Sequence, residues 1–252
     1  MIVSKKDIPN FLDKLLSDYQ VFAPVKEGTY TLFKQIASGS EAALDYGNPK
    51  LPAKEMFFPQ SERLYNYRYG EDGVKLDVPL DDQKKVIFGV RPCDAMSITL
   101  LDNVFNNDKY QDPYYLTRRQ NTIMIGIGCN DPASTCFCTS VNGGPFDTKG
   151  LDLLLVDIGD SYVVEVVSDA GRQVAEKAGF ASASDADKAA AAKVKEEAVV
   201  TCQVNLDGLK SKLDANFDDP IWNRIHEKCL GCGACTYVCP TCHCFDIVDD
   251  AV

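Results

Sequence analysis

Hydrophobic residues recur at helical spacing close to the start of the chain. Ser4 and Asp7 stand three residues apart, a capping-box pattern that marks the beginning of a helix. The apolar positions that follow are Ile8, Phe11, Leu12, Leu15, Leu16 and Tyr19. Two short strand-like segments come next, at 21–25 and 29–36. The pattern predicts an N-terminal helix with one buried face, followed by a pair of strands.

The middle of the chain alternates between strand and helix patterns. A continuous apolar run at 85–90 predicts a buried strand, and Asp94 is a plausible N-cap for the amphipathic helix after it. A second buried strand is expected at 122–128, and segments 151–158 and 162–167 are separated by a short turn typical of a hairpin. The order predicts an α/β (α+β) fold, a mixed sheet with an antiparallel edge and flanking helices.

The composition changes after about residue 169, which suggests three parts. Residues 1–180 are expected to form the mixed α/β domain with a cysteine-lined loop site. Residues 181–222 are alanine-rich and amphipathic, and they predict a helical linker. Residues 223–252 hold the densest cysteine cluster and predict a small, partial ferredoxin-like iron–sulfur domain.

Charge narrows the function classes. The 252 residues carry a formal net charge of −11, which repels phosphate backbones and anionic lipid, so nucleic-acid and membrane-surface binding are disfavoured. The longest apolar runs are strand-sized and far shorter than the roughly 20 residues of a membrane span. The N-terminus lacks the pattern of a secretion signal, so a cytoplasmic protein is expected.

One local exception to the acidic character is the segment 51–69, which is rich in aromatic and basic residues. It is interpreted as a loop and a helix rather than a regular strand. Lys54, Arg63 and Arg68 make it a positive patch, interpreted as a solvated face beside an aromatic anchor.

Cysteine is the unusual residue type. There are 11 cysteines, and six of them fall between residues 229 and 244. In a chain without a secretion signal, such clustering indicates metal binding rather than disulfides.

The strongest motif is C-x2-C-x2-C-x3-C-P at 229–240, the bacterial ferredoxin run that holds a [4Fe–4S] cluster. The expected ligands are Cys229, Cys232, Cys235 and Cys239. Gly231 and Gly233 are expected to let the backbone approach the inorganic sulfides of the cluster and donate N–H bonds to them. A zinc knuckle is the alternative, although it normally uses two separated C-x2-C pairs.

Several residues around this run have open roles. In two-cluster ferredoxins the fourth cysteine of one run binds the other cluster, and only one run is present here, so a C-terminally truncated chain is expected. Cys242, His243 and Cys244 are candidates for packing behind the cluster, for supporting it, or for binding zinc. A surface or supporting role is expected for His226.

A second candidate site consists of Cys93, Cys129, Cys136 and Cys138. Cys93 and Cys129 each follow a predicted strand, and parallel neighbouring strands would place both at the carboxyl edge of the sheet. Cys136 and Cys138 follow in the next loop. Four thiols there suffice for a second cubane cluster or a four-thiolate zinc site, and four unrelated buried cysteines are the alternative.

Cys93 alone suggests a different function. A thiol at a helix N-terminus beside Arg91 would have a lowered pKa and act as a nucleophile. No base is near it in sequence. Neither a G-x-G-x-x-G motif after a strand nor a P-loop is present, so no nicotinamide or flavin site is supported on this chain.

Several segments together resemble the 4Fe-4S dicluster family, which includes an electron-transfer subunit of anaerobic sulfite reductase and the beta subunit of sulfhydrogenases. They are AKEMFFPQSE (53–62), GVRPCDAMSITLLD (89–102), IGIGCNDPASTCFCTSVNGGP (125–145), DLLLVDIGD (152–160) and CLGCGACTYVCPTCHCFDI (229–247). The ferredoxin run alone is shared by many proteins, whereas the cysteine-bearing segments at 89–102 and 125–145 are far more specific.

The resemblance implies a non-catalytic electron-transfer subunit of an anaerobic oxidoreductase complex. It would relay electrons through [4Fe–4S] clusters between a flavin- and NAD(P)-binding partner and a catalytic partner of sulfite reductase or hydrogenase type. The family carries two clusters in its C-terminal domain, and this chain departs there because the second run is absent. Two other functions stay open: a zinc-stabilised scaffold subunit, and a thiol enzyme centred on Cys93.

Overall fold

The computed structural model describes residues 1–250, and its centre is a seven-stranded mixed sheet. The strand order is β1-β9-β8-β7-β6-β2-β3. The strands are β1 (Ile2–Ser4), β2 (Gln20–Glu27), β3 (Tyr30–Gln35), β6 (Lys85–Val90), β7 (Thr122–Ile127), β8 (Leu153–Asp157) and β9 (Ser161–Val166). Neighbours among β2, β6, β7 and β8 are parallel, and β1, β9 and β3 pair antiparallel at the two edges. The predicted mixed sheet and its hairpin are confirmed.

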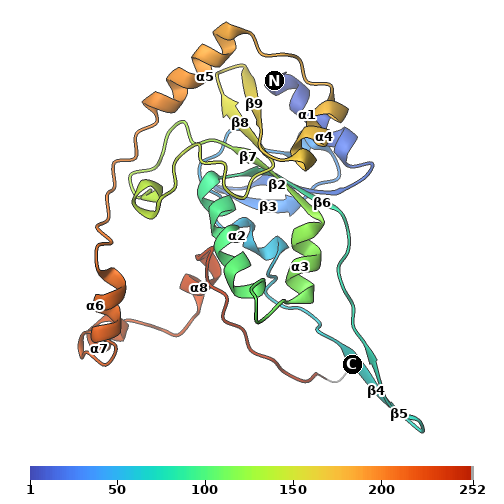
Figure 1. Ribbon diagram of the computed structural model, residues 1–252, viewed down its shortest axis with the longest axis vertical. Helices are drawn as coiled ribbons and strands as arrows, with labels where there is room; N and C mark the ends of the chain where they lie inside the picture. The colour runs from blue at the N-terminus through green and yellow to red at the C-terminus, as the bar shows by residue number, and fades with distance from the viewer. Residues whose placement is uncertain (251–252) are drawn as a thin grey trace.

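Helices cover both faces of this sheet (Figure 1). They are α1 (Ile8–Leu15), α2 (Pro92–Phe105), α3 (Pro113–Gln120), α4 (Asp169–Ala178) and α5 (Asp185–Glu197). The apolar stripe of α1 packs with α4 against one face, and α2, α3 and α5 pack against the other. We call the sheet, these five helices and the segment 53–58 that packs among them the α/β core. Because both faces are buried, β6 and β7 have almost no exposed residue, as their continuous apolar runs predict.

The remaining elements are short. They are the 3-10 helices η1 (Lys5–Asp7), η2 (Gly39–Glu41), η3 (Ala53–Met56) and η4 (Cys138–Val141), the hairpin strands β4 (Asn66–Gly70) and β5 (Gly73–Asp77), and helices α6 (Leu209–Ala215), α7 (Ile221–His226) and α8 (Ala234–Val238). The β4–β5 hairpin projects from the α/β core, and α6 and α7 lie on its other side (Figure 1). Within residues 1–250, no helix has the length and apolar character needed to cross a membrane.

Three local predictions are corrected by the structure. Asp94 is not an N-cap, because α2 begins at Pro92 with Arg91 in the cap position. The segment 51–69 contains β4 as well as a helical turn. Ser4 caps η1 rather than α1. The capping box of Ser184 with Asp187 is present at the start of α5.

The helix α5, which opens the segment predicted as a linker, packs on the sheet. Ala191 is buried in the same cluster as the side chains of β8, and Lys195 forms an ion pair with Glu165 of β9 at 2.6 Å. The boundaries after residues 180 and 222 stay predictions.

Candidate iron–sulfur site

The first candidate site lies at the carboxyl edge of the parallel strands. β6 ends at Val90 and β7 at Ile127, and the two strands are parallel neighbours. Cys93 therefore sits in the first turn of α2 and Cys129 two residues past β7, both at the edge where α/β sheets bind ligands. The register of the two strands shifts between Phe88 and Val90, immediately before these residues. The predicted placement of both thiols is confirmed.

Four thiols share this edge, and we call Cys93, Cys129, Cys136 and Cys138 the edge cysteines. Cys93 is exposed as a residue, but the protein atoms around its thiol desolvate it and raise its pKa to about 12, and the charges of Asp94, Cys129 and Cys138 contribute to the rise. Burial is also the main reason why the pKa values of Cys129 and Cys138 are raised, and Cys136 adds to both. Each thiol therefore lies within electrostatic range of others in the group, although 45 residues separate the first from the last.

The same result corrects one prediction about Cys93. A nucleophile needs a lowered pKa, but the desolvation of this thiol and the nearby Asp94 carboxylate hold its pKa well above the ordinary value. At neutral pH the free thiol is protonated and a poor nucleophile. Such a thiol can still bind a metal, because the metal's own positive charge displaces the proton.

A buried arginine holds the backbone around the edge cysteines. Arg91 donates to the carbonyl oxygens of Ile127 (3.3 Å) and Gly128 (2.8 Å), directly before Cys129. It also donates to those of Tyr46 and Gly47, and its guanidinium stacks on the Tyr46 ring. All these acceptors are neutral, and Arg91 forms no ion pair within the described part of the chain. Arg91 thus brings a positive charge to the cysteines, and that charge opposes the burial-driven rise in the pKa of Cys129.

The loop that carries Cys136 and Cys138 is tied down by further hydrogen bonds. The side-chain amide of Asn48 donates to the sulfur of Cys136 at 3.9 Å, and the backbone N–H of Gly143 donates to the carbonyl of Cys138 at 3.0 Å. Val204 N–H donates to Ser140 Oγ, so the chain around Cys202 lies against the same loop. Sequence reasoning missed Asn48 and Cys202, since neither belongs to a spaced motif.

The second candidate site is the C-terminal tail, residues 229–250, which includes the run cysteines Cys229, Cys232, Cys235 and Cys239. Gly231 and Gly233 adopt left-handed backbone conformations, with φ of +67° and +70°, that favour glycine. The Gly231 N–H donates to the thiol sulfur of Cys229 at 3.4 Å. Such N–H groups stabilise thiolates and tune cluster potentials.

Cys239 is prepared as a ligand by its neighbours. Burial alone would raise the pKa of Cys239, but hydrogen bonds from Thr241 and Cys242 lower it to about 7. The thiolate, which is the metal-binding form, is therefore substantially populated at neutral pH. Donating to Cys239 raises the pKa of Cys242 in turn. Cys244 is exposed, and His243 packs edge-to-face against Phe105 with ring centroids 6.4 Å apart.

The tail docks on the α/β core beside the edge cysteines. Lys54 of η3 donates to three carbonyl oxygens of the tail, and Phe58 packs against Phe245 with ring centroids 6.2 Å apart. Cys93 and Val238, the residue before Cys239, both line a cavity of about 110 Å³. The tail therefore lies next to Cys93, and the residue before the last run cysteine shares a cavity with it. Lys54 corrects the sequence interpretation, because it is buried whereas Arg63 and Arg68 are exposed.

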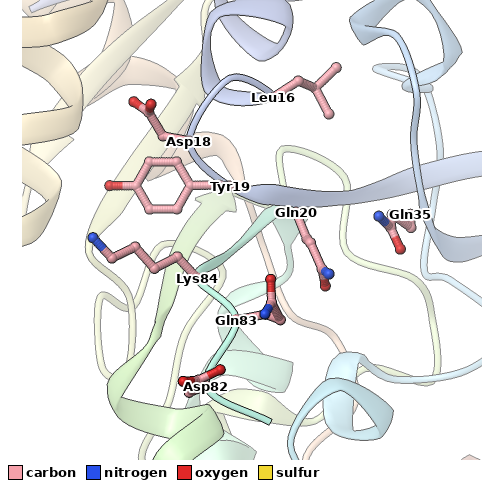
Figure 2. A pocket seen from close by; sticks show the side chains of 8 residues that line it. All are labelled: Leu16, Asp18, Tyr19, Gln20, Gln35, Asp82, Gln83 and Lys84. Atoms are coloured by element: carbon pink, nitrogen blue, oxygen red, sulfur yellow. The ribbon is translucent and has the colours of Figure 1, made fainter.

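A wider hollow lies away from the cysteines (Figure 2). It measures about 590 Å³ and is lined mainly by polar residues at the amino ends of β2 and β6, among them Gln20 and Lys84. Asp18 on its rim pairs with Lys177, whose hydrogen bond lowers the pKa of the Asp18 carboxyl. This edge of the sheet is opposite to the one that carries Cys93 and Cys129.

The donor set of both sites fits an iron–sulfur cluster. All 11 cysteines are free thiols, an N–H donates to one run sulfur, and each group has a buried cation beside it. Searched over residues 1–250, no three His, Cys, Asp or Glu side chains are close enough together to hold one metal ion. Thiolates of a cubane bind different irons and stand further apart than thiolates that share one ion with bonds of about 2.3 Å.

Comparison with known proteins shows the family to which this chain belongs. Residues 228–252 match the model of the 4Fe-4S dicluster domain. Over 249 residues the chain is 33% identical to sulfhydrogenase 2 subunit beta of Pyrococcus furiosus, an alignment that covers 96% of this chain and 71% of that protein. The chain belongs to the 4Fe-4S dicluster family of sulfhydrogenase beta subunits. No solved structure matches it significantly.

Membership in the dicluster family confirms the resemblance drawn from the cysteine-bearing segments. The matched domain contains all four run cysteines and establishes the chain as a metal-binding protein of the 4Fe–4S type. The alignment with the sulfhydrogenase protein extends across the α/β core, where the edge cysteines lie. Which cysteines bind which cluster remains a prediction.

Proposed function

We propose that this chain is the electron-transfer subunit of a cytoplasmic oxidoreductase complex. One [4Fe–4S] cluster would be held by Cys229, Cys232, Cys235 and Cys239. A second would be held by the edge cysteines. The relative's name describes the beta subunit of a sulfhydrogenase, which supports a complex of several subunits. We infer that the other subunits are a flavin- and NAD(P)-binding partner and a catalytic partner of sulfite reductase or hydrogenase type.

The observation that carries the proposal is the adjacency of the two thiol groups. Cys93 and Val238 line one cavity, although 145 residues separate them in the chain. A bound [4Fe–4S] cluster supplies one-electron storage without bond-making, and electron relay requires two such groups to be close. The other residues of this chain then hold the ligands in place. Arg91 fixes the backbone before Cys129, Asn48 contacts Cys136, and Lys54 fixes the tail.

Iron and sulfide analysis of the protein purified without oxygen tests the proposal. We expect a brown protein with about eight irons and eight sulfides per chain, since each cluster holds four of each. Cys93→Ser and Cys136→Ser are each expected to remove about half of the iron. Cys202→Ser is the matched control, because this partly buried thiol lies outside both proposed ligand sets.

Two results would overturn the proposal. A colourless protein that contains stoichiometric zinc would make the chain a metal-stabilised scaffold. Unchanged iron in both edge-cysteine variants would remove the second cluster. For the partners, anaerobic purification from the source organism is expected to co-isolate a flavin-containing protein, and a chain isolated alone would contradict that part.

A further inference from the structure

A buried lysine joins the α/β core to the tail. Lys54 lies in η3, and only 6% of its surface is exposed. Its Nζ donates to the carbonyl oxygens of Thr236 at 3.1 Å, Cys239 at 2.8 Å and Cys242 at 3.1 Å. An ammonium group has three donor hydrogens, so these three acceptors use its full capacity.

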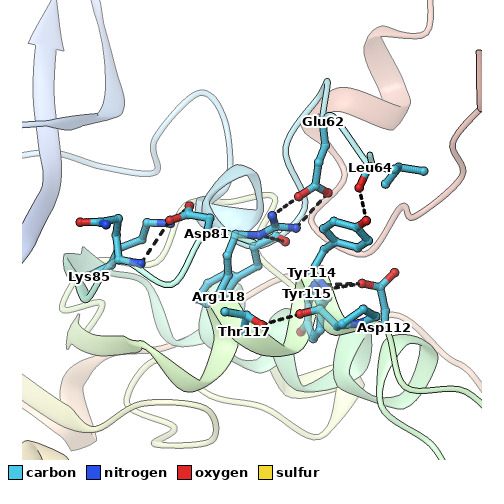
Figure 3. Close-up of polar contacts among 12 residues, drawn as sticks. Glu62, Leu64, Asp81, Lys85, Asp112, Tyr114, Tyr115, Thr117 and Arg118 are labelled. Carbon is cyan, nitrogen blue, oxygen red and sulfur yellow. Dashed lines mark hydrogen bonds and ion pairs between the residues drawn. The ribbon is translucent and has the colours of Figure 1, made fainter. Parts of the chain in front are cut away.

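Like Arg91, Lys54 is a buried cation with only carbonyl acceptors, whereas two other buried cations of the α/β core are paired with carboxylates. Lys85 is bonded to the carboxylate of Asp81, and Arg118 to that of Glu62 through both of its terminal nitrogens (Figure 3). Buried charges are normally compensated in this way because desolvation is costly. Lys54 forms no ion pair with any residue the structure describes, and its carbonyl partners carry only partial charge.

The group nearest to this uncompensated charge is the ferredoxin run itself. Cys239, one of the three acceptor residues, is also the last run cysteine, and its carbonyl oxygen lies 2.8 Å from the Lys54 Nζ. Four thiolates around an iron–sulfide core give a cluster with net negative charge, and each added electron makes it more negative. A fixed ammonium beside the run therefore favours the reduced cluster over the oxidised one.

We propose that Lys54 is a positioning residue that docks the tail on the α/β core and raises the reduction potential of the cluster held by the run. This inference rests on the proposed function, since it requires a cluster at the run. It adds a role for a core residue that lies 175 positions before the first run cysteine.

Redox titration of a charge-neutral variant tests the inference. Lys54→Met keeps an unbranched side chain that is one atom shorter and removes its charge. We expect the equilibrium constant for reduction of the run cluster to fall about tenfold, which corresponds to about 59 mV for a one-electron couple. Lys54→Arg keeps the charge and is expected to recover most of the potential. Lys85→Met is the matched control, because Lys85 is equally buried and pairs with Asp81 instead.

The outcomes separate this inference from the proposed function. Full iron content with an unchanged potential in Lys54→Met overturns the role of Lys54 and leaves the electron-transfer proposal intact. Wild-type protein without iron overturns the proposed function instead. An equal potential shift in Lys85→Met would also overturn the inference, because it would show a general effect of removing a buried charge.

A measurement on the wild-type protein covers the case in which Lys54→Met does not fold. With the cluster bound, acetic anhydride is expected to label Lys54 at least tenfold more slowly than the exposed Lys50, as read by peptide mass spectrometry. Removal of iron with a chelator is expected to release the tail and accelerate labelling of Lys54 but not of Lys85. Labelling of Lys54 at the rate of Lys50 in the loaded protein overturns the docking contact.

Discussion

Replacing Arg91 by methionine would separate the structural and the metal-related roles of its guanidinium. The variant leaves four backbone carbonyls, those of Tyr46, Gly47, Ile127 and Gly128, without their donor. A buried acceptor without a partner costs about 1–3 kcal/mol. Because several of these carbonyls are only partly buried and can bind water, we expect a total loss of about 3–5 kcal/mol.

This loss is large enough to measure by thermal unfolding of the iron-free protein. At about 2–4 °C per kcal/mol for a chain of this size, the melting temperature should fall by roughly 6–20 °C. The loop that carries Cys129 would also lose its anchor, so iron content after anaerobic reconstitution should fall by about half, with only the run cluster left.

The matched control for this experiment is Arg118→Met. Arg118 is equally buried and bonds to Glu62 and to the Phe57 carbonyl, away from the edge cysteines. It is expected to lose stability and to keep its iron. If Arg91→Met retains all of its iron, or if Arg118→Met loses as much iron as Arg91→Met, Arg91 has no specific role at the edge cysteines.

Two further predictions follow from the pKa shifts. In the iron-free protein at pH 8, iodoacetamide should modify Cys239 roughly 50-fold faster than Cys93. Their pKa values of about 7 and about 12 give very different thiolate fractions, and the greater nucleophilicity of the more basic thiolate offsets part of this difference. Equal rates of modification, measured by mass spectrometry, would contradict these two pKa values. Burial raises the pKa of Asp94 to about 6, above its ordinary value of 3.8. Between these two pH values the folded protein therefore holds a proton on Asp94 that the unfolded chain has lost. The iron-free protein should lose about 2–3 kcal/mol of stability as the pH rises from about 4 to 6. Asp94→Asn should remove this pH dependence in urea unfolding, and an unchanged slope would rule out Asp94 as its source.

The sequence predicts the centre of this fold well because both faces of the sheet are buried. Continuous apolar runs at β6 and β7 favour buried strands, and the edge positions of Cys93 and Cys129 follow once the two strands are parallel neighbours. The ferredoxin run is equally easy to predict, since its four cysteines lie close together in the sequence.

The sequence does not show which segments far apart in the chain contact each other. Lys54 lies in the same aromatic and basic segment as the exposed Arg63 and Arg68, and its hydrogen bonds to the distant tail cannot be predicted from the composition of that segment. The β4–β5 hairpin was missed because its residues are exposed on both faces, so no apolar alternation marks the strands. Asp94 has the chemistry of an N-cap, but Pro92 at the first helical position moves the start of α2 three residues earlier.

The contact between Lys54 and the tail also has a consequence for synthesis of the protein. Its three hydrogen bonds connect residues 182 to 188 positions apart, so the acceptors leave the ribosome long after Lys54 has been translated. Until then the ammonium group of Lys54 has no tail carbonyl to bind and stays hydrated. The tail can therefore close on Lys54 only after the α/β core has been translated, and the edge cysteines are available for loading before the run cysteines exist.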